Sequence, residues 1–284
     1  MPGGVDLHTH TTCSDGTFSP RALVAEAVKR GVRVLAVTDH DSTDGLAEAM
    51  AAARENPPLT IVPGIEINCD VEGAEIHVLG YYMAYEAAWF QDFCRAQREE
   101  RRARVVRTAE RLAELGLPID VERVFALVQE GSAGRPHIAR VMVERGYVKT
   151  VREAFDRYLA SGKPGHVPRK RFSPEDAVRL LRRAGGVPVL AHPGLADRDA
   201  MIPGLVEAGL MGIECYYPEH SPAQRGAYAE LCRRYRLVAT GGSDFHGPAV
   251  RAGHLGHPTV PLAVWEALQD KATESRARAA DQPA

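Results

Sequence analysis

The stretch VRVLAVTDH, residues 32–40, decides the fold. Its first six residues form a mostly apolar, β-branched run that is typical of a buried parallel strand, and the run leads directly into the polar triplet TDH at 38–40. A helix signal precedes it, because Ser19 is suited to an N-cap, Pro20 to the first turn, and Gly31 to the position just past the end. A helix followed by a strand with polar residues at its end predicts one unit of a parallel α/β fold.

The same alternation recurs along most of the chain, and strands that alternate with helices indicate a parallel sheet or barrel. Further helices are expected near 43–54, 173–186, 199–208 and 221–235. Further strands are expected at 59–64, 187–192, 212–217 and 237–242, with two more, EIN and IHVLGYYM, flanking a turn at residues 72–73.

Residues 86–165 interrupt this alternation. They contain a long charged helix at about 86–115 and at least two further helical stretches, without a convincing strand. We therefore expect residues 1–85 and 166–272 to form the α/β part, residues 86–165 to form an inserted all-helical lobe, and residues 273–284 to form a fraying tail.

Composition limits the classes of function. The chain has 284 residues, of which 45% are hydrophobic and 25% charged, so disorder and a disulfide-dense mini-protein are excluded. A net charge of −2 gives no global basic field for duplex DNA. The five cysteines are scattered and form no CxxC pair, which favours reduced thiols. With neither a signal peptide nor an apolar stretch long enough to span a bilayer, we expect a cytoplasmic protein without membrane contact.

Histidines and carboxylates gather at the expected strand ends. His8 and His10 are two residues apart, so on a strand both imidazoles project from the same face and can reach one metal ion. His77 begins its strand and reaches the same end only if that strand is antiparallel. Individually, Asp15 could cap a turn and Asp39 a helix, whereas His137, His166, His254 and His257 are expected to be ordinary structural or surface residues.

The ordered motifs VDLHTHTTCSDG (5–16), LAVTDHD (35–41), PGIEIN (63–68), EIHVLGY (75–81), VLAHP (189–193) and GGSDFHG (241–247) closely resemble the polymerase and histidinol phosphatase (PHP) family. The resemblance spans about 1–83 and 165–260. It implies a distorted seven-stranded β/α barrel with a trinuclear centre of Mn, Fe or Zn that hydrolyses phosphoesters. The metal ligands that it implies are His8, His10, Asp15, His40, Glu66, His77, His192, Asp244 and His246.

The resemblance also implies a substrate class. A stand-alone chain whose insertion contains Gly-Arg-Pro-His is similar to nucleoside 3′,5′-bisphosphate phosphatases, which are also linked to 5′-to-3′ trimming of short RNA. Manganese is the preferred expectation for the metal. Divalent ions held by His and carboxylate lower the pKa of bound water toward about 7, so a metal-bound hydroxide acts as nucleophile and no protein nucleophile is required.

Candidate substrate-binding residues lie mostly in the insertion. The segment 97–112 carries six arginines, most of which fit a solvated helix face with Glu–Arg pairs, while Arg101 and Arg102 are candidates for reaching the substrate. Gly134 and Arg135 belong to a Gly-rich turn before a helix, where guanidinium and backbone N–H groups favour a phosphate, although an ordinary loop-to-helix junction has the same pattern. His220 follows a strand end and is a further candidate.

Two other functions fit the same motifs. A phosphatase for a small metabolite such as histidinol phosphate would share the metal chemistry and differ in the lobe. A non-catalytic module, in which metals only stabilise the fold, would keep the ligands without turnover; the complete ligand set argues against it.

Overall fold

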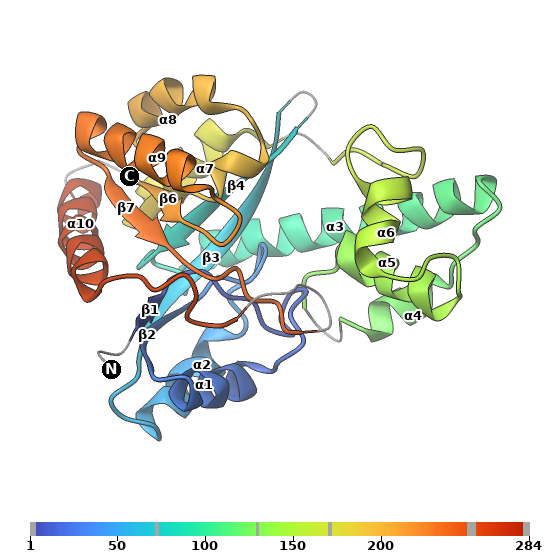
Figure 1. Cartoon of the computed structure of the whole chain (residues 1–284), viewed down its shortest axis with the longest axis horizontal. Coiled ribbons are helices and arrows are strands. Elements are labelled where there is room, and N and C mark those ends of the chain that lie inside the picture. The colour runs from blue at the N-terminus through green and yellow to red at the C-terminus, as the bar shows by residue number, and fades with distance from the viewer. Residues whose placement is uncertain (1–3, 72–73, 129–130, 170–171, 249–253, 281–284) are drawn as a thin grey trace.

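The computed structural model describes residues 4–71, 74–128, 131–169, 172–248 and 254–280, and these form a mixed α/β fold with a seven-stranded sheet (Figure 1). The strands lie in chain order within the sheet. They are β1 (Gly4–Asp6), β2 (Val32–Val37), β3 (Thr60–Val71), β4 (Ala74–Tyr81), β5 (Val187–Leu190), β6 (Gly212–Tyr216) and β7 (Val238–Gly241).

The direction of β4 differs from that of the other strands. Strands β1, β2 and β3 pair in parallel, as do β5, β6 and β7, whereas β4 is antiparallel to both β3 and β5. His77 was expected to reach the other histidines only if its strand is antiparallel, and β4 meets this condition. Backbone hydrogen bonds also link the two edges of the sheet, because Leu7 N–H donates to Gly241 O at 3.2 Å and His10 N–H donates to Phe245 O at 3.0 Å.

Helices cover the sheet and extend from it. The sheet-covering helices are α1 (Pro20–Lys29), α2 (Leu46–Arg54), α7 (Pro174–Arg183), α8 (Ile202–Ala208), α9 (Pro222–Tyr235) and α10 (Leu262–Ala280), with short 3₁₀ turns η2 (Pro193–Leu195) and η3 (Asp199–Met201). The inserted helices are α3 (Ala88–Glu114), α4 (Val121–Ala126), α5 (Arg135–Glu144) and α6 (Val151–Ala154), followed by the π-helical turn η1 (Phe155–Leu159).

Side-chain alternation along the strands builds two cores. Val34 and Ala36 belong to one buried cluster and Leu35 and Val37 to the other, as expected when successive side chains of a strand point to opposite faces. A third cluster lies within residues 105–159 and packs the inserted helices on one another. Because these helices have their own core beside the sheet, we propose that residues 86–165 form a lobe (Figure 1).

Two sequence expectations require correction, and a third falls on residues that are not described. The strands expected at 59–64 and at EIN are one continuous strand, β3, which begins at Thr60 and contains Glu66. The expected turn at 72–73 lies outside the described residues. The tail expected from residue 273 continues helix α10 to Ala280, because Ser275 is buried and donates to Gly186 O at 2.6 Å. Among the described residues, no helix combines the length and apolarity needed to cross a bilayer.

Candidate metal centre

The nine residues predicted to bind metal come together in the structure. His8 and His10 follow β1, His40 follows β2, and His192 follows β5, so the ends of parallel strands deliver several donors to the same place. Four overlapping groups have their ligand atoms within 4.8 Å of one another: His10, Asp15, His40 and His246; His8, His192 and Asp244; His8, His10 and Glu66; and His40, Glu66 and His77.

Glu66 lies at the middle of these groups. One of its carboxylate oxygens, Oε2, is 2.8 Å from His40 Nδ1 and 3.3 Å from His10 Nε2. The other, Oε1, is 2.8 Å from His77 Nδ1 and 3.2 Å from His192 Nε2. Each oxygen of this carboxylate therefore faces a different pair of imidazoles.

Several buried atoms of the cluster lie at ion-pair distance from one another without the geometry of a hydrogen bond. They are His8 Nε2, His10 Nε2, Asp15 Oδ1, His40 Nδ1 and Glu66 Oε2. Buried polar groups are nearly always hydrogen-bonded, so five such atoms facing one another need another partner. Imidazole nitrogens and carboxylate oxygens are ligands of Zn, Fe and Mn ions. The residues therefore fit the expected metals, and the cluster indicates divalent metal binding.

The electrostatics of the cluster favour cations. Burial opposes the ionisation of Asp15, yet the imidazoles of His246 and His40 hold its pKa well below the usual range. Burial also opposes the ionisation of Glu66, yet His40 and His77 hold its pKa well below normal. Burial lowers the pKa of His40 to about 4, so this imidazole is neutral at pH 7 and its nitrogen can act as a ligand. The carboxylates are thus charged inside the protein.

A second layer of residues orients the donors. Glu214 on β6 is fully buried, and its Oε1 is 3.0 Å from His8 Nδ1 while its Oε2 accepts from the backbone N–H of His192 at 2.8 Å. Tyr217 donates its hydroxyl to Asp244 Oδ2 at 2.8 Å. A carboxylate behind a ligating histidine fixes its tautomer and ring orientation. Glu214 is not among the residues predicted from the sequence, although a Glu within the apolar strand GIECY was a signal.

Local backbone geometry also serves the cluster. Asp39 accepts from the backbone N–H of Thr11 at 2.8 Å and from Ser14 Oγ at 2.5 Å, so it holds the loop that carries Asp15 rather than capping a helix. His192 and Asp244 have φ of 23° and 51°, which non-glycine residues adopt rarely. Such conformations cost on the order of 1–3 kcal/mol each and persist where the surrounding structure imposes them, often at functional sites.

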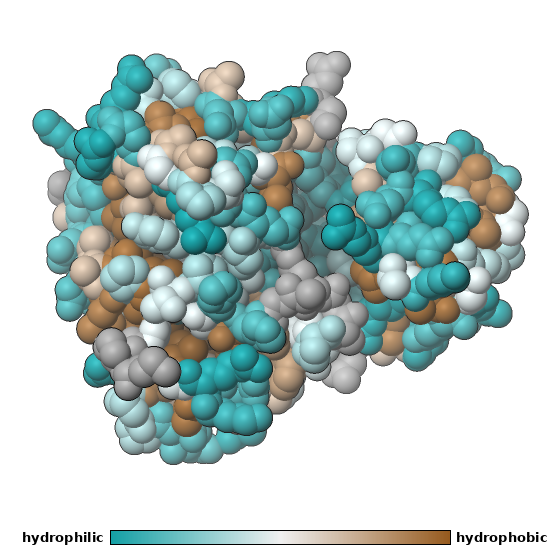
Figure 2. Space-filling model, viewed as in Figure 1, coloured by the Kyte–Doolittle hydropathy of each residue, from teal (hydrophilic) through white to brown (hydrophobic). Residues whose placement is uncertain are grey.

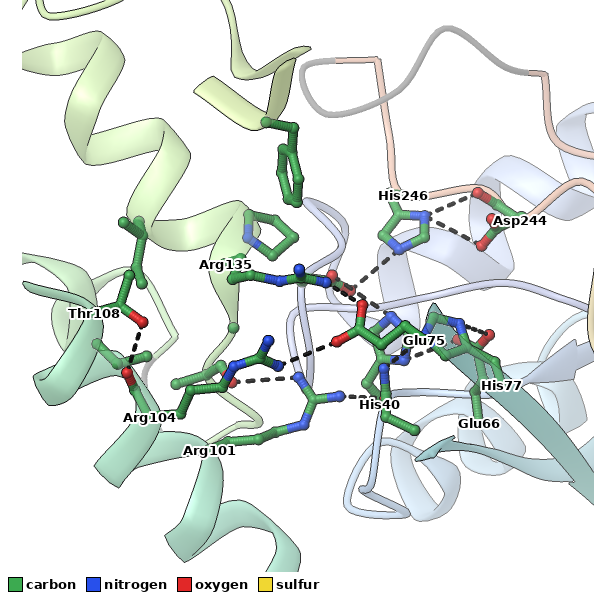
Figure 3. Close-up of a pocket in the computed structure, with 18 of the residues that line it drawn as sticks. His40, Glu66, Glu75, His77, Arg101, Arg104, Thr108, Arg135, Asp244 and His246 are labelled. Atoms are coloured by element: carbon green, nitrogen blue, oxygen red, sulfur yellow. Dashed lines mark hydrogen bonds and ion pairs between the residues drawn. The ribbon is translucent and has the colours of Figure 1, made fainter. Parts of the chain in front are cut away.

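A cavity of about 270 Å³ extends from the metal donors to the inserted lobe. One side is lined by Asp15, His40, Glu66, His77, His192, Asp244 and His246, and the other by residues of α3, α5 and η1, including Arg101, Arg104 and Arg135. Figure 3 shows the three arginines reaching from the helices toward Glu75 and the histidines. In the space-filling view, a furrow separates the lobe from the sheet-bearing part (Figure 2).

The arginines of this cavity have protein partners. Arg101 Nε is 2.6 Å from Asp41 Oδ2, and its Nη2 donates to Asn68, whose amide nitrogen is 2.7 Å from His77 Nε2. Arg104 and Arg135 both pair with Glu75. Arg101 thus connects the lobe to a metal donor through one intervening side chain.

The predicted substrate-binding residues divide into two groups. Arg101, Gly134 and Arg135 line the cavity. Arg102 does not, because consecutive residues lie about 100° apart around a helix, and its guanidinium is instead 3.9 Å from the ring centroid of Phe125.

His220 also lies outside the cavity lining. It is buried, and both of its ring nitrogens are engaged: Nε2 accepts from Gly194 N–H at 3.2 Å, and Nδ1 lies 3.0 Å from Cys215 O. Neither Arg102 nor His220 lines the cavity, so contact of these two residues with the substrate stays a prediction. His220 supports the turn η2, which follows His192.

Fold and site together define an α/β protein with a metal centre opening into a cavity that also presents arginines. A PHP domain matches residues 6–161, a range that includes most of the helical lobe. The chain is 37% identical over 249 residues to the 5′-3′ exoribonuclease Rnm of Escherichia coli, covering 86% of this chain and 85% of that protein. The chain belongs to the PHP domain family.

Other relatives have names that describe a phosphodiesterase and a phosphatase. A phosphoribosyl 1,2-cyclic phosphate 1,2-diphosphodiesterase of Eggerthella lenta is 37% identical, covering 88% of this chain and 97% of that protein. A 3′,5′-nucleoside bisphosphate phosphatase of Chromobacterium violaceum is 32% identical, covering 93% and 96%. The crystal structure of a proposed metal-dependent phosphoesterase from Bifidobacterium adolescentis superposes with a TM-score of 0.88 at 31% identity, covering 95% and 97%.

These comparisons confirm the predicted family and the enzyme class. The chain is a metal-dependent phosphoesterase, a hydrolase of phosphate esters. The alternative of a non-catalytic module is not retained.

Proposed function

We propose that the enzyme removes the 3′-phosphate of nucleoside 3′,5′-bisphosphates to give nucleoside 5′-monophosphates, and that the same site trims short RNA from its 5′ end. The observation that carries this proposal is the division of one cavity into two ends: metal donors at one end and Arg135 with Gly134 at the other. A substrate with two phosphates can use both ends at once, because a guanidinium and a helix N-terminus both favour a phosphate.

The proposed metal content is three divalent ions, with manganese preferred, held by the nine predicted ligands. His8, His10, His40 and Glu66 each belong to two of the four donor groups. This overlap supports several neighbouring ions rather than one. When bound, such ions make hydroxide available from water at neutral pH and neutralise the phosphoryl oxygens.

The chain's own residues position these components. Glu66 faces imidazoles with both carboxylate oxygens. Glu214 orients His8 and the backbone of His192. Tyr217 donates its hydroxyl to Asp244 and so fixes the position of that carboxylate. Arg135 holds the second phosphate, and the lobe that carries it covers the cavity, so water is excluded from part of the substrate.

A second candidate follows from the Eggerthella lenta relative, whose name describes a phosphodiesterase of a phosphoribosyl cyclic phosphate. This substrate class also combines an ester at the reacting centre with another phosphate on a ribose. The two candidates differ in how the second anion is placed relative to the ester that reacts.

A substrate panel tests the proposal. The manganese-loaded enzyme is assayed with adenosine 3′,5′-bisphosphate, a phosphoribosyl 1,2-cyclic phosphate, histidinol phosphate and a 5′-phosphorylated trinucleotide. We expect the highest kcat/KM with the bisphosphate and measurable release of 5′-mononucleotides from the trinucleotide. A higher kcat/KM with the cyclic phosphate would establish the second candidate, and preference for histidinol phosphate would exclude both.

A further inference from the structure

Glu75 lies between two arginines at the wall of the metal cavity. Its Oε1 is 3.1 Å from Arg104 Nη1, and its Oε2 pairs with Arg135 Nη2. Arg104 belongs to α3 and Arg135 to α5, whereas Glu75 belongs to β4. One carboxylate from the sheet therefore bridges two guanidinium groups from the lobe, and Figure 3 shows all three side chains in one view.

The pairing leaves one excess positive charge. Two arginines and one glutamate sum to +1, and the two guanidinium groups are close enough that Arg135, together with burial, lowers the pKa of Arg104. A phosphate dianion would compensate this pair fully, and phosphate oxygens accept from guanidinium groups with the same forked geometry as a carboxylate. The pair is therefore built to hold an anion, and in the free protein that anion is Glu75.

The position of Glu75 also leaves space for it to move. Besides the metal cavity, its side chain lines two neighbouring hollows of about 190 Å³ and 400 Å³. A rotation about its side-chain torsions would take the carboxylate from the arginines toward one of these spaces. Arg104 and Arg135 keep other contacts, because Arg104 Nε donates to Val167 O at 2.7 Å and Arg135 Nη1 donates to Leu159 O at 3.2 Å.

Resting on the proposed function, we infer that Glu75 occupies the position of the substrate's second phosphate in the free enzyme. Arg104 and Arg135 together form the subsite for that phosphate, and Glu75 competes with it. The Glu75 carboxylate thus lowers the affinity of this subsite for every anion. A phosphate dianion displaces Glu75 more readily than an anion that binds the two arginines more weakly.

Glu75 could instead act only as a bridge that ties the lobe to the sheet. The two roles predict opposite results when the charge of Glu75 is removed. A bridge would loosen the arginines and weaken anion binding, whereas a competitor would release them and strengthen it.

The experiment compares Glu75→Gln with Glu75→Asp and Glu114→Gln in the manganese-loaded full chain. Glu114 is an exposed glutamate of α3 paired with Arg111, so its substitution removes an equal charge at a position outside the cavity. The measured quantity is the KM for adenosine 3′,5′-bisphosphate divided by the KM for an aryl phosphate. We expect Glu75→Gln to lower this ratio about tenfold, and the two control variants to change it less than threefold. An unchanged or raised ratio in Glu75→Gln overturns the inference.

Arg104→Met provides a second test that does not depend on the folding of the Glu75 variants. It should raise the same KM ratio about tenfold, and the double variant Glu75→Gln, Arg104→Met should lose the gain of the single Glu75→Gln variant. An Arg104→Met ratio equal to the parent's removes Arg104 from the subsite and overturns the inference.

Binding of inorganic sulfate, measured by calorimetry, distinguishes failure of this inference from failure of the proposed function. If the parent enzyme hydrolyses the aryl phosphate but not the bisphosphate, the proposed function fails. Sulfate affinity then still reports on the subsite: it should rise about tenfold in Glu75→Gln and stay at the parental value in the double variant. Equal sulfate affinity in all variants overturns the inference by itself.

Discussion

The two ends of the cavity satisfy their polar groups in opposite ways. At the metal end, buried atoms such as His10 Nε2 and Glu66 Oε2 have no hydrogen-bond partner. At the lobe end, Arg101 is paired with Asp41, and Arg104 and Arg135 are paired with Glu75. The metal end is thus prepared for cations from outside, whereas the positive charge of the lobe end is partly compensated from within, by Glu75 and Asp41. A substrate anion must compete there with a carboxylate of the protein.

The largest expected effect is at the metal end. Glu66→Gln and Asp244→Asn keep the side-chain size but remove the charge that favours a cation, so each should lower kcat by about a thousandfold or more, since several kcal/mol of charge stabilisation are lost. The measurement is kcat together with bound manganese per chain. His257→Ala, at an exposed position, serves as the control and should keep both values. Near-parental turnover in either carboxamide variant would exclude that residue from the metal centre.

The next effect is at the lobe end. Arg135→Ala should lower kcat/KM for adenosine 3′,5′-bisphosphate by about a hundredfold, which corresponds to about 2.7 kcal/mol. A generic aryl phosphate has no second anion, so its kcat/KM should fall much less. Arg135→Lys should recover only part of the loss, because an ammonium keeps the charge without the planar fork. An equal loss on both substrates would mean that Arg135 supports the fold or the metal centre instead.

The sequence pointed more directly to the metal end than to the lobe end. The predicted donors belong to short motifs, such as HTH (8–10) and SDFH (243–246), and these motifs carry the family resemblance that implies the ligand set. Glu75 and Arg104 acquire their roles only through pairing across the insertion, which no local motif records. Distinguishing Arg101 from Arg102 required the rotational phase of α3, which the evenly charged segment 97–112 does not fix.

A smaller effect is expected behind the metal end. Glu214→Gln keeps the shape of the side chain, but it removes the carboxylate that faces His8 Nδ1. Loss of such a supporting carboxylate typically weakens metal affinity by about 10–100-fold. Manganese affinity of the metal-free variant, measured by competition with a chelator, should fall within this range while kcat at saturating manganese changes less. Parental affinity would show that Glu214 only fills space.

The smallest expected effect concerns a histidine of the lobe and tests whether burial alone marks a metal ligand. His137 is as buried as the metal donors, yet its Nδ1 accepts from the backbone N–H of Gly134 at 3.2 Å and so has a partner at the start of α5. Burial lowers the pKa of His137 to about 4. The unfolded chain has an ordinary histidine pKa of about 6.5 and therefore binds more protons between these two values. This contribution to stability is present above pH 6.5 and is lost as the pH falls toward 4.

His137→Gln isolates this contribution. A glutamine at the third helical position can still accept from the backbone N–H that precedes the helix, but it does not titrate. Between pH 7.5 and pH 5, the parent should therefore lose about 2 kcal/mol more unfolding free energy than the variant does. Denaturant unfolding at the two pH values measures this difference, and titration of the metal donors, common to both proteins, cancels. Equal losses of unfolding free energy in the parent and the variant would show that His137 is protonated in the folded enzyme at pH 5. The contrast between His137 and the histidines of the metal end that lack a hydrogen-bond partner would then fail.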